Sequence, residues 1–65
     1  MKRRDLLDHL SDHGCRFLRE GGSHTIWENP TERRRTSIPR HREIPALTCR
    51  RICRQLNAPP PPARE

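Results

Sequence analysis

The chain has 65 residues, of which 29% are hydrophobic, so it can form at most one small domain with a core near the minimum for stable folding. Its 14 Lys and Arg against 8 Asp and Glu give a formal net charge of +6, which favours a polyanion as partner. No apolar run approaches the roughly 20 residues that span a bilayer. The basic start at Lys2 to Arg4 continues into Asp5 and not into the apolar region of a signal peptide. Composition therefore favours a cytoplasmic protein that binds nucleic acid and no membrane.

Apolar periodicity predicts a first helix over residues 3–13. Leu6, Leu7 and Leu10 recur at helical spacing, and Gly14 stands where a helix commonly ends in a left-handed residue.

Strands are predicted to follow this helix, in three short runs separated by turn residues: 15–20, 25–27 and 35–38. Gly21 and Gly22 suit the turn between the first two runs, and Asn29 with Pro30 ends the second. The polar residues 31–34 are expected to form a loop.

A second helix is predicted after Pro45, which suits a first helical turn. Its apolar residues follow the i, i+3, i+4, i+7 pattern: Cys49, Ile52, Cys53 and Leu56. Residues 59–65 are expected to be a Pro-rich disordered tail with no assigned function. The order of helix, three strands and helix predicts an α+β fold, a three-stranded antiparallel sheet with both helices on one face.

The cysteines and the single tryptophan are interpreted as core residues. Cys15, Cys49 and Cys53 are odd in number and lack a disulfide-framework spacing, so they are expected to be free thiols buried as small apolar side chains. A zinc ion held by Cys49 and Cys53 in a metal-binding adaptor stays open as an alternative. Trp27 is expected in the core, with stacking on a base as its alternative.

The segment around His24 has the residue types that metal-free RNA cleavage requires. Attack by a 2′-hydroxyl on the adjacent phosphate needs a proton acceptor, a proton donor and positive charge on the phosphorane, and histidine ordinarily titrates near neutral pH. Gly22 and Ser23 offer backbone amides and a hydroxyl beside His24, and Arg19 can reach a phosphate. No metal or cofactor is needed for this chemistry. His41 is left as a second proton carrier, a phosphate ligand or a loop-fixing residue.

Motifs that are shared with one protein family extend from Lys2 to about Pro60. They comprise the opening residues 2–7, the turn 13–15, the block 18–27 with Gly22, Ser23 and His24, the segment 38–44 and residues 50–56. With these motifs the chain resembles the HicA family of bacterial toxins. The resemblance implies a double-stranded-RNA-binding-like α-β-β-β-α domain over residues 1–58, an endoribonuclease (mRNA interferase) activity, a HicB-like antitoxin as partner, and His24 as the catalytic residue. The chain departs from the family pattern at Leu47 and Thr48, where many relatives have a glycine followed by leucine.

RNA binding is assigned to basic and turn residues around this motif: Arg19, Gly22, Ser23, Arg33, Arg34, Arg35, Arg40, His41 and Arg42. We expect the arginines among residues 33–42 to form a basic rim that contacts the RNA backbone. Two functions of different classes fit these residues, a ribonuclease toxin and a non-catalytic RNA- or DNA-binding module. They differ in whether RNA cleavage depends on His24.

Overall fold

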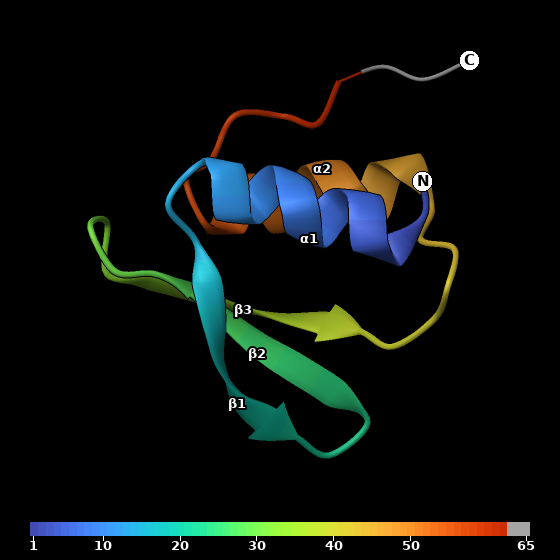
Figure 1. Ribbon diagram of the computed structural model, residues 1–65, viewed down its shortest axis with the longest axis horizontal. Coiled ribbons are helices and arrows are strands. Elements are labelled where there is room, and N and C mark those ends of the chain that lie inside the picture. Colours follow the sequence, from blue (N-terminus) through green and yellow to red (C-terminus); the bar gives the residue numbers. More distant parts are fainter. Residues whose placement is uncertain (63–65) are drawn as a thin grey trace.

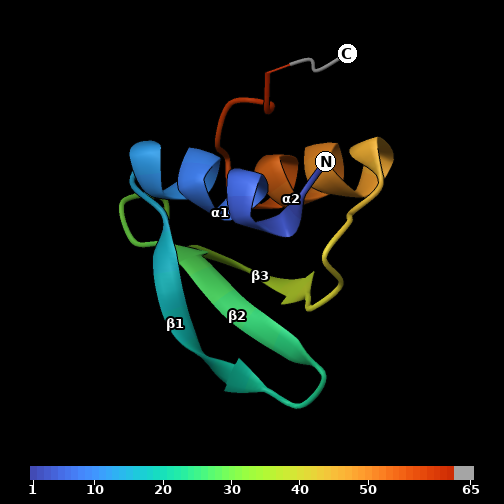
Figure 2. The same cartoon turned by 45° about the vertical axis from the view of Figure 1, so that its right-hand side comes forward.

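Two helices lie side by side over one face of a three-stranded antiparallel sheet and leave the other face open (Figure 1). The computed structural model describes residues 1–62. Its elements are α1 (Arg3–Asp12), β1 (Arg16–Gly21), β2 (His24–Asn29), β3 (Arg34–Pro39) and α2 (Ala46–Gln55). The predicted α-β-β-β-α order, with both helices on one face, is confirmed; Figure 2 shows the same arrangement after a turn.

Both helices end through a left-handed residue. Gly14 has φ +85°, and the amide of Cys15 donates to the carbonyl of Leu10 at 2.9 Å. Asn57 has φ +54° after α2, where the amide of Ala58 donates to the Cys53 carbonyl at 2.8 Å. These bonds satisfy carbonyl groups that a helix end otherwise leaves free. The predicted stop at Gly14 is confirmed, although His13 caps α1 and is not part of it.

Pro45 precedes α2 and does not belong to its first turn. Its ψ of 147° is extended, and its carbonyl accepts from the Cys49 amide at 3.0 Å, so Pro45 is the N-cap. The predicted start of the second helix at Pro45 was therefore one residue too early.

The strands pair in the order β1-β2-β3, with His24 opposite Pro39 and Asn29 opposite Arg34 across β2 and β3. Each of these two strands is longer than predicted, because residues of low strand propensity at the ends join the ladder through hydrogen bonds to the neighbouring strand. Between β1 and β2 the register shifts between Phe17 and Arg19.

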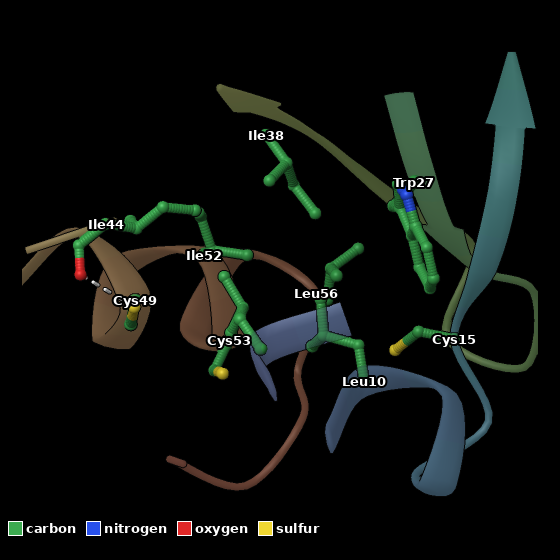
Figure 3. Close-up of a cluster of buried hydrophobic side chains, with 10 residues drawn as sticks. Leu10, Cys15, Trp27, Ile38, Ile44, Cys49, Ile52, Cys53 and Leu56 are labelled. Atoms are coloured by element: carbon green, nitrogen blue, oxygen red, sulfur yellow. Dashed lines mark hydrogen bonds between the residues drawn. The ribbon is translucent and has the colours of Figure 1, made fainter. Parts of the chain in front are cut away.

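The core fills the space between the helices and the sheet (Figure 3). Its buried side chains are Leu6, Leu10, Cys15, Trp27, Ile38, Ile44, Cys49, Ile52, Cys53 and Leu56. Trp27 is 8% exposed, so its assignment to the core is confirmed and the stacking alternative is wrong.

All three cysteines are free thiols buried in this core, as expected. Burial, followed by the neighbouring Cys49 and Cys15, raises the pKa of the Cys53 thiol to about 11. Burial also raises the pKa of Cys15 and Cys49. These thiols stay neutral at physiological pH and pack as apolar groups.

The first residues of the chain pair with the connection between β3 and α2. The Ile44 amide donates to the Met1 carbonyl at 2.8 Å, and the Arg3 amide donates to the Arg42 carbonyl at 2.7 Å. Lys2 and Glu43 form the bridge between them. This pairing, called here the N-terminal clasp, brings together residues about forty positions apart.

Residues 59–62 form neither helix nor strand and run over the helices on the side away from the sheet (Figure 1). The Nε2 atom of His9 donates to the Pro59 carbonyl at 2.8 Å, so the start of the predicted tail contacts α1. The rest of that tail, residues 63–65, lies outside the described residues. Over residues 1–62, no helix has both the length and the apolar character needed to cross a membrane.

Candidate active site

His24 is the first residue of β2 and lies on the open face of the sheet. Along β2 the buried residues are Thr25, Trp27 and Asn29, whose side chains face the helices. Because side chains alternate along a strand, the exposed His24 projects to the opposite, helix-free side. The imidazole is thus open to a ligand without any rearrangement of the core.

The turn before His24 consists of two residues, Gly22 and Ser23, since Gly21 pairs directly with His24. Gly22 has φ +62°, as the first central residue of a type II′ hairpin turn requires, which explains a glycine there. The Ser23 hydroxyl and the Nδ1 atom of His24 share a hydrogen bond of 3.1 Å. In the described chain, neither the Gly22 nor the Ser23 amide donates to another group, so both amides remain available to a ligand.

A β-bulge places Arg19 on the same face as His24. Phe17 pairs with the inward-facing Trp27, and a regular strand would send Arg19 to that inner side as well. The register shift after Phe17 instead pairs Arg19 with Ile26, which is on the open face. Arg19 is thereby a diagonal cross-strand neighbour of His24, a relation in which the Cβ atoms lie somewhat less than about 7–8 Å apart. Its long side chain can therefore reach a phosphate held at His24.

The remaining charges of the open face are unequally compensated. The Nε atom of Arg16 donates to the Glu28 carboxylate at 2.8 Å, so these two charges offset each other. Arg35 of β3 lies opposite Glu28 of β2. Over the described residues, neither Arg19 nor Arg35 has an ion pair. The open face thus keeps two unneutralised guanidinium groups together with the imidazole.

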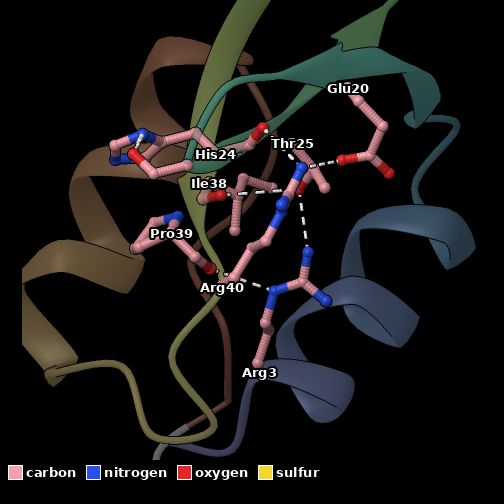
Figure 4. A network of polar contacts seen from close by, with 8 residues as sticks. Arg3, Glu20, His24, Thr25, Ile38, Pro39 and Arg40 are labelled. Atoms are coloured by element: carbon pink, nitrogen blue, oxygen red, sulfur yellow. Dashed lines mark hydrogen bonds and ion pairs between the residues drawn. The ribbon is translucent and has the colours of Figure 1, made fainter.

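A polar network supports the backbone behind His24 (Figure 4). Arg3 donates from Nη2 to Thr25 Oγ1 at 2.8 Å and from Nε to the Pro39 carbonyl at 3.0 Å. Arg40 donates to the Glu20 carboxylate and, at 3.5 Å, to the His24 carbonyl. In Figure 4 the His24 ring points away from Arg3, Glu20 and Arg40.

Four of the six predicted RNA-binding arginines lie in two pairs at opposite ends of the strands. Arg33 and Arg34 lie at the turn between β2 and β3, where Asn29 pairs with Arg34. Arg40 and Arg42 follow Pro39 at the other end of the strands, the end that carries His24. Five residue steps of about 3.3 Å separate the two ends of β2. The expected basic rim is therefore divided between the two ends of the sheet, and its contact with the RNA backbone stays a prediction.

His41 lies at the His24 end of the sheet. It is exposed and stands two residues beyond Pro39, the cross-strand partner of His24. Its three alternatives therefore stay open. The other two histidines lie together on α1 and its cap, with ring centroids 4.5 Å apart, and take no part in this face.

The structure adds residues that the sequence pattern did not single out. Lys2, Arg3 and Arg4 come together with Arg40 and Arg42 around one pocket. No local spacing in the sequence predicts this group, because the N-terminal clasp joins two segments that are distant in sequence. The available signal was only the basic composition of both segments.

The zinc alternative has no ligand set in the part of the chain that is described. Among residues 1–62 no three His, Cys, Asp or Glu side chains lie together as metal ligands. Cys49 and Cys53 are fully packed in the core, where the Cys49 thiol donates to the Ile44 carbonyl at 3.6 Å.

Comparison with known proteins yields one family. The family described as the HicA toxin of bacterial toxin–antitoxin systems matches residues 3–58, which include every helix and strand. No curated protein and no solved structure matched the chain.

Proposed function

Because the chain belongs to the HicA family of toxins of bacterial toxin–antitoxin systems, we propose that it is a metal-independent endoribonuclease that cleaves mRNA with His24. The family is known for RNase-like activity and implies a cognate antitoxin as partner. Since its proposed substrate is mRNA, the proposed site of action is the cytoplasm.

One observation carries the proposal: the exposed imidazole of His24 shares the open sheet face with Arg19, which has no ion pair in residues 1–62. An imidazole at that position contributes nothing to the core. It is a proton carrier placed beside a fixed positive charge, the combination that RNA cleavage requires.

The proposed reaction is transfer of the phosphoryl group to the ribose 2′-oxygen. As the 2′-oxygen attacks phosphorus and the bond from phosphorus to the 5′-oxygen breaks, His24 accepts the 2′-hydroxyl proton or donates a proton to the departing 5′-oxygen, and water takes or supplies the other proton. Arg19 and the free amides of Gly22 and Ser23 stabilise the negative charge that develops on the phosphorane. The Ser23 hydroxyl orients the ring through its bond to Nδ1. These groups belong to the chain itself, so the proposed reaction needs no metal or cofactor.

RNA binding is proposed for the basic residues on both sides of this centre. Arg35 lies on the open face with Arg19, and Arg33 and Arg34 extend the contact toward the distant turn. Arg40, Arg42 and His41 flank the His24 end. The arginines contact phosphate groups, because a guanidinium can bind two phosphate oxygens at once.

A HicB-like antitoxin is proposed to inhibit the toxin by covering the His24 face. The net charge of +6 attracts an acidic partner and speeds its association. Burial of partly exposed apolar groups such as Ile26 on this face would add stability to the complex.

The test is cleavage of a long RNA in EDTA by the purified chain and by its His24→Ala variant. We expect the variant to lose cleavage by about 10²–10⁴-fold, as removal of a general acid–base group does, and to lose growth inhibition while it still folds and binds the antitoxin. His13→Ala is the matched control, because this exposed histidine lies beyond α1 and far from the open face along the chain.

Equal cleavage by the parent and His24→Ala would overturn the assignment, and a loss in His41→Ala would then move the catalytic role to that residue. A parent that binds RNA without cutting it would favour the alternative, a non-catalytic RNA- or DNA-binding module with this fold.

A further inference from the structure

A basic pocket of about 590 Å³ opens where the start of α1 meets the connection between β3 and α2. Its lining residues are Lys2, Arg3, Arg4, Arg40, Arg42 and Glu43. Figure 2 shows the two segments running side by side at this place. Five of the six lining side chains carry a positive charge.

The pocket is distinct from the open face that carries His24. Arg3 and Arg40 approach β2 from the helix side, where they bond to Thr25 and to the His24 carbonyl, while the His24 ring points away from them (Figure 4). The pocket and the proposed catalytic centre therefore lie on two sides of the same strand end, with Arg40 between them.

The N-terminal clasp fixes this cluster of like charges. The bond from the Arg3 amide to the Arg42 carbonyl and the bridge between Lys2 and Glu43 hold the two segments against each other. Like charges held this close repel, so their proximity opposes folding. A bound anion would remove that repulsion.

Most of the positive charge in the pocket is available to a ligand. Over residues 1–62, neither Lys2 nor Arg42 makes an ion pair or a side-chain hydrogen bond, and both are exposed. Among the described residues, the one ion pair of Arg4 is with Asp5, at 4.0 Å. The single carboxylate of the lining, Glu43, lies 3.9 Å from the Met1 nitrogen and offsets one charge at most.

We propose that this pocket is a second phosphate-binding site, which holds a phosphodiester of the RNA backbone some nucleotides away from the one at His24. The inference rests on the proposed function. Lys2, Arg4 and Arg42 bind the phosphate oxygens. Arg3 joins the pocket to the end of the sheet through its bonds to Thr25 and Pro39. The RNA passes the end of the β-strands at Arg40, so that binding in the pocket positions the RNA over His24.

The experiment measures RNA binding in a His24→Ala background, in which the RNA stays intact. The probe is a fluorescently labelled single-stranded RNA of about 12 nucleotides, within the range that small single-strand-binding folds cover. The pocket variant is Lys2→Ala with Arg4→Ala, two exposed lining residues that the proposed function does not use. Its matched control is Arg50→Ala with Arg51→Ala, two exposed arginines of α2 outside the pocket and the open face.

Loss of two phosphate contacts should make the slope of log affinity against log salt shallower by about 1.4, since each contact contributes about 0.7 for a single strand. The control should leave the slope unchanged. With His24 intact, the pocket variant should raise KM for cleavage and leave kcat near the parent value, the signature of lost binding energy remote from the reacting atoms.

Equal changes in the pocket variant and the control would mean that only net charge matters, and would overturn the pocket while the proposed function stands. A pocket variant with a reduced kcat and an unchanged KM would also overturn it. A chain that neither binds nor cuts the RNA would overturn the proposed function and this inference together.

Discussion

Arg3 and Thr25 connect the first helix to the strand that begins with His24. The Arg3 guanidinium donates to the Thr25 hydroxyl at 2.8 Å, and through Nε it also binds the carbonyl of Pro39 at 3.0 Å. Thr25 follows His24 in the chain, and Pro39 is the cross-strand partner of His24. One side chain from α1 therefore bonds to the residue after the proposed catalytic residue and to the residue opposite it on β3.

Replacement of this hydroxyl tests the connection. Thr25→Val keeps the shape of the side chain and removes the acceptor for Arg3, so the free energy of unfolding should fall by about 1 kcal/mol. Urea denaturation measures the change. Thr31→Val, at an exposed loop position, should leave stability unaltered. Equal stability of the two variants would show that the Arg3–Thr25 bond is not formed in solution.

The core predicts large effects for single side chains. Leu10 is fully buried and Ile52 is 3% exposed, so replacement of either by alanine should cost about 2–4 kcal/mol. Since small domains have little stability to lose, each variant should be largely unfolded when isolated. Leu47→Ala is the control, because Leu47 is 62% exposed. Thermal melting distinguishes them, and parent-like melting of both core variants would contradict the assigned helix faces.

RNA binding should depend steeply on salt. The chain has many arginines and few aromatic side chains, which favours phosphate contacts over base stacking. If about three to five phosphates are neutralised, log affinity for a single strand should fall with log salt at a slope of about −2 to −3.5. Titrations at several salt concentrations measure this slope. Affinity that does not change with salt would refute phosphate-dominated binding.

Alkaline pH should destabilise the protein through its buried thiols. Burial raises the pKa of Cys53 from the ordinary 9.0 to about 11, so between these values the unfolded chain has lost the proton that the folded chain keeps. Stability is fully present below pH 9 and falls as the pH rises toward 11. The sequence has no Tyr and a single Lys, so few other groups titrate there.

The corresponding measurement is the melting temperature at a series of pH values above 8. A Cys53→Ala variant should lose less stability over this range than the parent does. A parent whose melting temperature stays constant up to pH 11 would show that the thiol is not shielded from water.

Local patterns were sufficient for the helices and for the approximate strands. The spacing of Leu6 and Leu10, and of Cys49, Ile52 and Leu56, identified the faces that are now buried, because a helix repeats within four residues. Gly14 marked the end of α1 for an equally local reason, its positive φ. The predicted turn at Gly21 and Gly22 was one residue early, because Gly21 pairs with His24 and the turn is formed by Gly22 and Ser23.

The extent of the strands and the assembly of the site depend on contacts between distant residues. Asn29 belongs to β2 because it pairs with Arg34 and because its side chain donates to the Leu56 carbonyl at 2.8 Å. The bulge that moves Arg19 to the His24 face exists only in the pairing of two strands. Neither relation leaves a repeating signal along one segment.

Composition and short-range spacing thus established a basic α+β domain with a histidine after a glycine turn. The separation of Arg34 from Arg40, and the pocket that joins Arg4 to Arg42, arise from the sheet register and the N-terminal clasp. Those are hydrogen bonds between backbone groups, which every residue carries alike, so the identities of the residues do not reveal which partners meet.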